Sequence, residues 1–238
     1  MKPERLQLEH IDAALRTWAL HRIVQEEVYP VLIAAETLRR AEYDRAFPHL
    51  LMSAAVHEAE RLEHAGHFLS PAVCYHTYAA LEGRSLAQGA TITARGRCFR
   101  NEDAAQLVPG RRQIEFEMRE VVLIGERDWI ESELAPVRDD IAGMAESFGM
   151  EGAWEAASDP FFLPSSGGKA AMQRLLGTKL EYCLPSAAGL AVASINRHGT
   201  FFGDRFHITT ASDAPAHTAC VAFGLDRWAA QSTTKLTP

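Results

Sequence analysis

Two strand-like runs that flank a Pro-Gly turn constrain the fold of this chain more than any other feature. The runs are CFRNE, which begins at residue 98, and RRQIEFEMREVV, which begins at residue 111, and the turn between them is Pro109-Gly110. Strand-like runs on both sides of such a turn predict an antiparallel β-hairpin. Charged residues occupy interior positions of both arms, so these residues either lie on a solvated face or line a site.

Strand signals continue through the second half of the chain. From residue 90 onward, short strand-like runs are bounded by Gly, Pro or Asn, and helical patterns occupy residues 134–158 and 167–178. Successive strands joined in hairpins form an antiparallel sheet, so the sequence predicts an α+β fold. The last strand-like run leads into GLDRWAAQ, which predicts a helix directly after a strand.

Helical patterns dominate the first half of the chain. Residues 3–28 and 50–66 carry apolar residues at helical spacing among many charges, which predicts amphipathic helices that cover the sheet. Between them, Pro30 and Pro48 bracket a segment that we expect to form an extended arm, a helix and a turn.

Two short motifs resemble functional signatures but lack an essential residue. His57 and Glu58 begin like the metal-binding helix of a zinc protease, but the second His is missing, so we expect an exposed helix face. The segment 167–170, GGKA, resembles part of a phosphate-binding loop, but no Ser or Thr follows the Lys, so we expect a turn.

Composition and charge exclude several functional classes. At 238 residues and 47% hydrophobic residues, the chain can bury one sizeable core, and we expect a single domain. A formal charge of −7 argues against a broad nucleic-acid surface. No apolar run is long enough to span a membrane, and the charged N-terminus lacks the apolar stretch of a secretion signal. These features predict a cytoplasmic protein without membrane contact.

The charged hairpin can be interpreted from the alternation of side chains along a strand. On the first arm, Cys98, Arg100 and Glu102 share a face. The returning arm has its own shared face, made of Arg112, Phe116, Met118 and Glu120. If the two faces coincide, cations, carboxylates and an aromatic ring surround one site, a combination that suits a nucleotide. The alternative is an ordinary two-faced hairpin with solvated charges.

Several segments resemble a known family of enzymes. The hairpin itself resembles motif 2 of the class II aminoacyl-tRNA synthetases, and CVAFGLDRW resembles motif 3. PAVCYHTY, SDPFF, QRLLGTKLE and SINRHGTFFG extend the match. In this order, from about Tyr29 to Arg227, the segments resemble the amino acid:carrier protein ligases, homologues of the methanogen seryl-tRNA synthetases that lack a tRNA-binding domain. The resemblance implies an antiparallel sheet flanked by helices, and one catalytic domain over residues 1–238.

The resemblance also implies a zinc site. The four cysteines lie far apart and without CxxC pairing, so they are free thiols or metal ligands rather than a disulfide framework. The family's zinc ligands correspond to Cys74 on a strand before motif 2, Glu120 and Cys220. Three protein ligands leave a fourth position for the amino group of the substrate. The alternative is that Cys74 and Cys220 are buried small hydrophobic residues. We expect Cys98 and Cys183 to be such core residues.

The nucleotide site follows from the same resemblance. Arg100, on the α-phosphate, and Glu102, toward the adenine or amino-acid side, are the expected catalytic residues and also bind ATP. Phe116 and Arg227 are expected to sandwich the adenine. The other nucleotide-binding residues that the resemblance implies are Arg112, Gln113, Lys179, Ala193, Ser194, Ile195 and Asn196. For Lys179 the alternative is an exposed strand charge, and His198 is set aside as a structural histidine.

The function that the resemblance implies is an ATP-dependent, AMP-forming ligase. It would activate a small amino acid such as glycine, alanine or serine with ATP and Mg²⁺, and pass it to the phosphopantetheine thiol of an acidic carrier protein. Neither tRNA nor another nucleic acid is expected as a partner, and a homodimer is expected through residues 28–50. The alternative is a non-catalytic or specialised paralogue that binds the amino acid or its adenylate, or that serves another acceptor.

Overall fold

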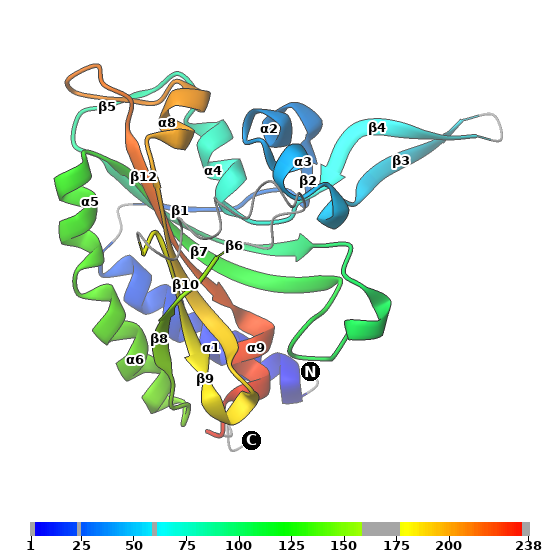
Figure 1. Ribbon diagram of the computed structural model, residues 1–238, viewed down its shortest axis with the longest axis vertical. Coiled ribbons are helices and arrows are strands. Elements are labelled where there is room, and N and C mark those ends of the chain that lie inside the picture. The colour runs from blue at the N-terminus through cyan, green and yellow to red at the C-terminus, as the bar shows by residue number, and fades with distance from the viewer. Residues whose placement is uncertain (1–2, 23–24, 59–60, 159–176, 235–238) are drawn as a thin grey trace.

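A mostly antiparallel sheet lies at the centre of the molecule. The computed structural model describes residues 3–22, 25–58, 61–158 and 177–234 (Figure 1). In spatial order, the strands of the main sheet are β1 (Gln25–Glu27), β6 (Ala90–Phe99), β7 (Glu115–Gly125), β12 (His217–Gly224), β10 (Leu190–Gly199), β9 (Lys179–Leu184) and β8 (Ala153–Ala156). β1 runs parallel to β6, and the other neighbouring strands are antiparallel. The predicted α+β class is confirmed.

One face of this sheet is covered by helices and holds the larger core. The helices are α1 (Pro3–Leu20), α5 (Arg127–Leu134), α6 (Val137–Ser147) and α9 (Leu225–Gln231). α1 contributes apolar residues at helical spacing, Leu8, Ile11, Leu15 and Ala19, all buried. α9 follows β12 directly, as predicted, and buries Trp228 in the same core. Among the described residues, we find no helix with both the length and the apolarity that a membrane crossing requires.

The opposite face is only partly covered. α4 (Cys74–Ala80) and α8 (Phe201–Phe206) pack on it near the β5 (Ser85–Leu86) and β11 (Thr209–Thr210) strand pair (Figure 1). Tyr78 and Phe202 stack between the two helices, with ring centroids 4.2 Å apart. The rest of this face borders a cavity.

The arm between α1 and α4 forms a small subassembly beside that cavity. Its elements are β2 (Leu32–Ala34), α2 (Ala35–Arg40), α3 (Tyr43–Ala46), the short 3-10 helix η1 (Pro48–Leu50), β3 (Ser53–Glu58) and β4 (Arg61–Leu69). β2, β4 and β3 form an antiparallel sheet, and the β3–β4 hairpin projects from the body of the molecule (Figure 1). The predicted order of extended arm, helix and turn over residues 29–51 is confirmed.

The prediction of a helix over residues 50–66 is wrong, because this segment forms the β3–β4 hairpin. β4 pairs on one side with β3 and on the other with β2, which lies far away in the sequence. Local periodicity cannot show such a distant strand partner, and strand pairing overrides it. His57 and Glu58 therefore belong to a strand and not to an exposed helix face.

Other predicted boundaries also differ from the structure. The helix expected over residues 3–28 ends at Leu20, and β1 then pairs with β6. The segment 134–158 holds α6 but ends in strand β8, which pairs with β9. Most of the helix predicted over residues 167–178, and the turn at 167–170, lie outside the described residues.

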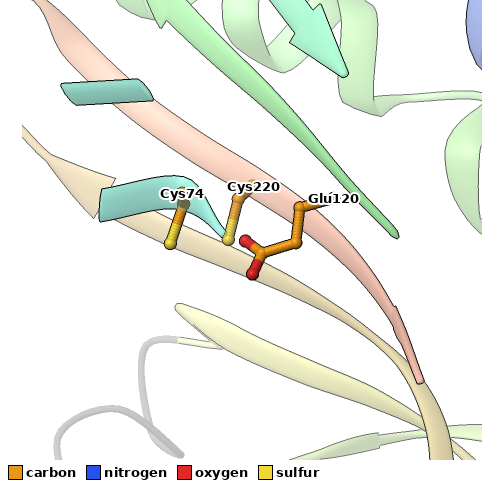
Figure 2. Close-up of side chains that lie close together, drawn as sticks. All are labelled: Cys74, Glu120 and Cys220. Atoms are coloured by element: carbon orange, nitrogen blue, oxygen red, sulfur yellow. The ribbon is translucent and has the colours of Figure 1, made fainter. Parts of the chain in front are cut away.

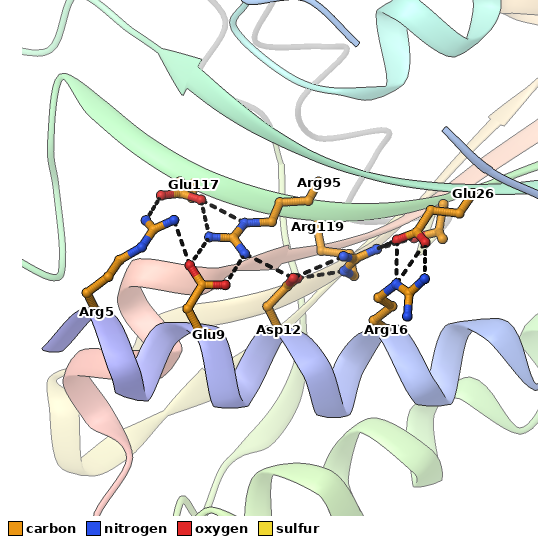
Figure 3. A network of polar contacts seen from close by, with 9 residues as sticks. Arg5, Glu9, Asp12, Arg16, Glu26, Arg95, Glu117 and Arg119 are labelled. Carbon is orange, nitrogen blue, oxygen red and sulfur yellow. Dashed lines mark hydrogen bonds and ion pairs between the residues drawn. The ribbon is translucent and has the colours of Figure 1, made fainter. Parts of the chain in front are cut away.

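A network of charged residues attaches α1 to the sheet (Figure 3). Arg119, on β7, is 2% exposed, and its guanidinium forms two hydrogen bonds to the carboxylate of Asp12, at 2.7 and 3.1 Å. Arg95, on β6, bonds Glu9 at 2.7 Å and Asp12 at 3.1 Å. Glu26, on β1, lies 3.2 Å from Arg119. The network therefore fixes the position of α1 across the strands whose other face borders the cavity.

Candidate functional site

A cavity of about 620 Å³ lies on the open face of the main sheet. A cavity of this volume is within the range that holds a nucleotide-sized ligand. Its floor is formed by β7, β12 and β10, and its walls by α3, α4, α8 and the loop between β6 and β7. The predicted residues that line it are Arg100, Glu102, Arg112, Gln113, Phe116, Lys179, Ala193, Ser194, Asn196 and Arg227, together with Cys74, Glu120 and Cys220.

Ile195 is the predicted nucleotide-binding residue whose side chain the structure places elsewhere. It is fully buried in the core beneath α1, α5 and α6, on the opposite face of the sheet. Its neighbours Ser194 and Asn196 line the cavity. The alternation of side chains along β10 explains why the Ile195 side chain lies on the other face of the sheet.

Three predicted metal ligands that line the cavity converge on one another (Figure 2). One ligand atom from each of Cys74, Glu120 and Cys220 lies within 4.8 Å of the others, and all three residues are buried. Glu120 comes from β7 and Cys220 from the adjacent β12, while Cys74 is the first residue of α4. The prediction that Cys74 lies on a strand is therefore wrong, although its position at the site is right. The backbone N–H of Val73 donates to Glu120 Oε1 at 2.9 Å and orients this carboxylate.

The three buried side chains would carry three negative charges if all were ionised, so the cluster requires either a cation or bound protons. Burial, followed by the nearby charge of Cys220, raises the pKa of Glu120 to about 8. The Cys74 thiol donates to the sulfur of Cys220, which raises the pKa of Cys74 and lowers that of Cys220. A divalent metal ion would replace the retained protons, and its two positive charges would offset most of the negative charge of the three ligands. Two thiolates and a carboxylate are ligands that zinc accepts in proteins, so the donor set fits the metal.

Arg100 and Phe116 form the centre of the expected nucleotide site. β6 ends at Phe99, and the backbone N–H of Arg100 continues the ladder to Ile114 O at 2.9 Å. Its guanidinium carbon lies 5.0 Å from the centroid of the Phe116 ring, and Nε donates to Pro71 O at 3.1 Å. This is a cation–π arrangement that fixes the direction of the arginine side chain.

The register of the hairpin confirms part of the face predicted from alternation. Cys98 pairs with Phe116, so these two side chains lie on one face of the sheet. Met118 and Glu120 lie on the same face of β7 and line the cavity. Arg112 lies beyond the paired strands, where its Nη1 donates to Glu102 at 3.2 Å and to the amide oxygen of Gln106 at 2.9 Å.

The predicted Pro-Gly turn shapes the loop between β6 and β7. Gly110 has a φ of +69°, and a Cβ there would clash with the side chain of Ala230 on α9. Only glycine allows this approach of the loop to the helix without strain. Its N–H donates to the side-chain oxygen of Gln113 at 2.6 Å. The turn thereby places Gln113 and Arg112 at the mouth of the cavity.

Two further cations complete the site. Arg227, on α9, donates to Arg111 O at 2.9 Å and to Ala191 O at 2.8 Å. Burial, followed by the positive charge of Arg100, lowers the pKa of Arg227, which indicates a site that favours an anionic ligand. Lys179 is 12% exposed and pairs with Glu181 at 3.1 Å, so the alternative of an exposed strand charge is excluded.

Two features of the cavity were missed in the sequence. His198 lines it, and its Nε2 lies 4.0 Å from the sulfur of Cys220. The nearest sequence signal is its position two residues after Asn196 on β10, but the strand register shifts at His198. Glu42 also lines the cavity, with a φ of +55° and an ion pair to Arg205. No local pattern marks Glu42, since its partner is distant in the sequence.

Comparison with solved structures defines the class of this fold. A chain in the complex of A. aeolicus tRNASec with M. kandleri SerRS has a TM-score of 0.76 and 22% identity to this chain, and the match covers 95% of this chain and 51% of that chain. Prolyl-tRNA synthetase from Cryptosporidium parvum matches with a TM-score of 0.74 and 14% identity, over 96% of this chain and 45% of that one. The molecule has the catalytic fold of the class II aminoacyl-tRNA synthetases.

Sequence comparison places the chain in a particular family. It is 32% identical over 225 residues to amino acid:acyl-carrier-protein ligases 2 and 1 of Bradyrhizobium diazoefficiens; the matches cover 84% of this chain and 66% and 68% of those proteins. The chain belongs to this ligase family and spans about two thirds of the length of these relatives. A type-2 serine–tRNA ligase of Methanococcus maripaludis is 30% identical over 127 residues, which cover 48% of this chain and 24% of that protein. No protein-family model matches the chain.

Proposed function

We propose that this chain is an ATP-dependent ligase that activates a small amino acid as its adenylate and transfers it to the phosphopantetheine thiol of an acyl carrier protein. One observation carries the proposal: a single cavity holds both the Arg100–Phe116 pair and the buried Cys74–Glu120–Cys220 cluster. The first suits a nucleotide and the second suits a metal that can bind an amino group. Membership of the ligase family supports the same reaction.

The first half-reaction requires no protein nucleophile. The amino-acid carboxylate attacks the α-phosphorus of ATP, an oxygen–phosphorus bond forms, and pyrophosphate leaves as its Mg²⁺ complex. Arg100 is assigned to the α-phosphate, where it would stabilise the charge that develops on the phosphate oxygens. Phe116 and Arg227 are assigned to the adenine, and Glu102 to the adenine or amino-acid side. The remaining contribution is the alignment of the two reactants.

The amino acid is assigned to the metal end of the cavity. Cys74, Glu120 and Cys220 would hold a zinc ion, which offers a fourth position to the amino group of the substrate. Binding through the amino group would select a substrate with a free α-amine and would leave its carboxylate available for reaction with the nucleotide. Glycine, alanine and serine are the substrates that we propose, on the basis of the family resemblance.

The second half-reaction transfers the aminoacyl group to a thiol. The phosphopantetheine sulfur attacks the carbonyl carbon of the adenylate, a thioester forms, and AMP leaves. We propose an acidic carrier protein as the acceptor, in keeping with the names of the relatives, rather than tRNA, because the chain carries a net charge of −7. The further proposals are a homodimer, a location in the cytoplasm, and one catalytic domain over residues 1–238.

Loading of a carrier protein tests the proposal as a whole. The protein is incubated with ATP, Mg²⁺, one amino acid and a phosphopantetheinylated carrier protein, and the intact mass of the carrier protein is measured. The expected result is a mass increase equal to one aminoacyl group, removed by hydroxylamine because the bond is a thioester. Carrier protein without phosphopantetheine is the control and should gain no mass. A protein that binds the amino acid but loads no acceptor would be the specialised paralogue.

A further inference from the structure

His198 occupies an irregular position on β10, next to the candidate metal site. Arg197 pairs with Ala219 and Gly199 with Thr218, so His198 is the extra residue of a β-bulge. Bulges redirect side chains and are common beside active sites. The imidazole lies edge-on to the ring of Phe202, with centroids 4.9 Å apart, and it lines the cavity. Packing therefore holds the ring in one orientation.

The neighbours of His198 favour one position for the proton on its ring. Tyr78 is fully buried, and within the described residues its hydroxyl has a single hydrogen-bond partner, Nδ1 of His198, at 3.4 Å. The Thr218 hydroxyl lies 3.3 Å from the same nitrogen. A buried phenol must give its proton to an acceptor, and Nδ1 is the acceptor within reach among the described residues, so this contact favours a proton-free Nδ1. The ring proton is then on Nε2.

Nε2 is the nitrogen that faces the metal cluster. It lies 4.0 Å from Cys220 Sγ, and Nδ2 of Asn196 lies 3.5 Å from the same sulfur. Asn196 pairs directly with Cys220 across the two strands, which fixes its approach. In the part of the chain that the structure describes, these side-chain N–H groups approach Cys220, and no comparable pair approaches Cys74. The two thiolates of the site therefore have different surroundings.

We propose that His198 is a positioning residue of the metal site, which donates its Nε2 proton to the Cys220 thiolate and is held in that tautomer by Tyr78. Hydrogen bonds from neighbouring groups orient the ligands of a metal and tune it. Together with the Asn196 contact, this hydrogen bond draws electron density from the sulfur. A metal held there would then remain electron-deficient enough to bind a fourth, neutral ligand such as a primary amine. The inference rests on the proposed function, because it assumes a metal at this cluster.

Cobalt(II) in place of zinc gives a readout that is separate from activity. Thiolate-to-cobalt charge-transfer bands are measured for the wild-type protein, His198→Ala, His198→Gln and Tyr78→Phe. In His198→Ala the Cys220 thiolate loses a hydrogen bond and should hold its electrons less tightly, so its band should move to lower energy. The sulfur also loses a group that orients it, so metal affinity should fall about 10–100-fold. His198→Gln keeps an N–H donor and should restore most of the wild-type spectrum. Tyr78→Phe removes the hydroxyl that holds the His198 proton on Nε2, so its band should show part of the same shift.

The controls separate this inference from the proposed function. His21→Ala removes an exposed imidazole at the end of α1 and should leave the spectrum unchanged. A wild-type protein without thiolate-to-cobalt bands would reject the metal site itself. A normal wild-type spectrum that His198→Ala leaves unchanged in energy and affinity would overturn the role of His198 alone. Equal shifts in His198→Ala and His198→Gln would overturn it as well, because the effect would then be steric.

Discussion

Arg97 and Arg100 are close in the sequence but lie in different surroundings. Arg97 faces the α1 side of the sheet, is 53% exposed and pairs with Glu115 at 3.1 Å. Arg100, past the end of β6, lies over Phe116 and lines the cavity. The alternation of side chains along the strand produces this difference. The pair therefore provides a matched test, in which the same chemical change is made inside and outside the proposed site.

Arg100→Ala should reduce amino-acid-dependent pyrophosphate exchange by about a hundredfold or more. The loss of one preorganised charge contact to the transition state corresponds to about 3 kcal/mol. Exchange is measured with labelled pyrophosphate at saturating ATP. Arg97→Ala is the control and should retain activity near that of the wild type. Equal losses in the two variants would show that surface charge, and not the proposed phosphate contact, explains the effect.

Cys74→Ser, Glu120→Ala and Cys220→Ser should each abolish stoichiometric zinc binding. Each variant removes one of three ligands, and two ligands do not hold zinc tightly in competition with water. Metal content of the purified proteins is measured by elemental analysis, with about one zinc per chain expected for the wild type. Cys183→Ser changes a buried cysteine outside the cluster and should keep its zinc. Full zinc content in all three ligand variants would reject this assignment.

At the scale of elements, α1 supports the part of the main sheet that holds β1, β6 and β7. Its buried residues pack beneath β7, and its charged face bonds Arg95 and Arg119 (Figure 3). The other face of β7 carries Phe116 and Glu120, so the rigidity of this strand bears on both halves of the proposed site. An ion pair buried in this way costs much more to break than one on the surface.

Asp12→Ala should lower the free energy of unfolding by about 3 kcal/mol. The change leaves the buried Arg119 without its main partner, and the cost lies at the lower end of the range for such pairs because Glu26 remains 3.2 Å away. Urea denaturation measures the loss. Glu36→Ala breaks the exposed pair with Arg39 and should cost less than about 1 kcal/mol. Similar losses in both variants would contradict the structural role of the network.

Acid should weaken the same network. Hydrogen bonds from Arg95 lower the pKa of Glu9, and those from Arg16 lower the pKa of Glu26, below the ordinary value of 4.5. A carboxylate whose folded-state pKa is lowered contributes stability above the unfolded value and loses it as the pH falls. Unfolding free energies at pH 6 and pH 3.5 should therefore differ less in Glu9→Gln than in the wild type. If the difference between the two pH values is the same in Glu9→Gln and in the wild type, Glu9 does not contribute to the acid sensitivity.

The sequence predicts local features of this molecule better than features that depend on distant contacts. Alternation placed Phe116, Met118 and Glu120 on one face, because strand geometry acts over a few residues. It did not reveal the β3–β4 hairpin, whose partner strand β2 is distant in the sequence. The position of Cys74 at the start of a helix depends on packing between α4 and β7, which no local pattern encodes.

At the scale of the whole molecule, the site depends on segments from across the chain. The family resemblance predicts that Cys74, Glu120 and Cys220 form one site, because matching motifs carry information about distant contacts. It also implied nucleotide contacts over residues 193–196, a stretch in which the side chain of Ile195 faces the core. The network around His198 was missed, because a bulge and a buried tyrosine define it.

We predict a homodimer through residues 28–50. Val28 is 89% exposed, and Val31 and Leu32 are also exposed, which leaves apolar side chains open to a partner in this segment. Sedimentation at micromolar concentration should give twice the mass of the chain. Val28→Asp should shift the equilibrium toward monomer, while Val56→Asp on the projecting hairpin should have a smaller effect. A monomeric wild-type protein would contradict the prediction.

The central claim is that one cavity activates an amino acid with ATP, and pyrophosphate exchange tests it most directly. The protein is incubated with ATP, Mg²⁺, labelled pyrophosphate and each of the twenty amino acids in turn. The account predicts that label enters ATP with one or a few small amino acids, from among glycine, alanine and serine, and not in their absence. No exchange with any amino acid, in protein that contains its metal, would contradict the claim.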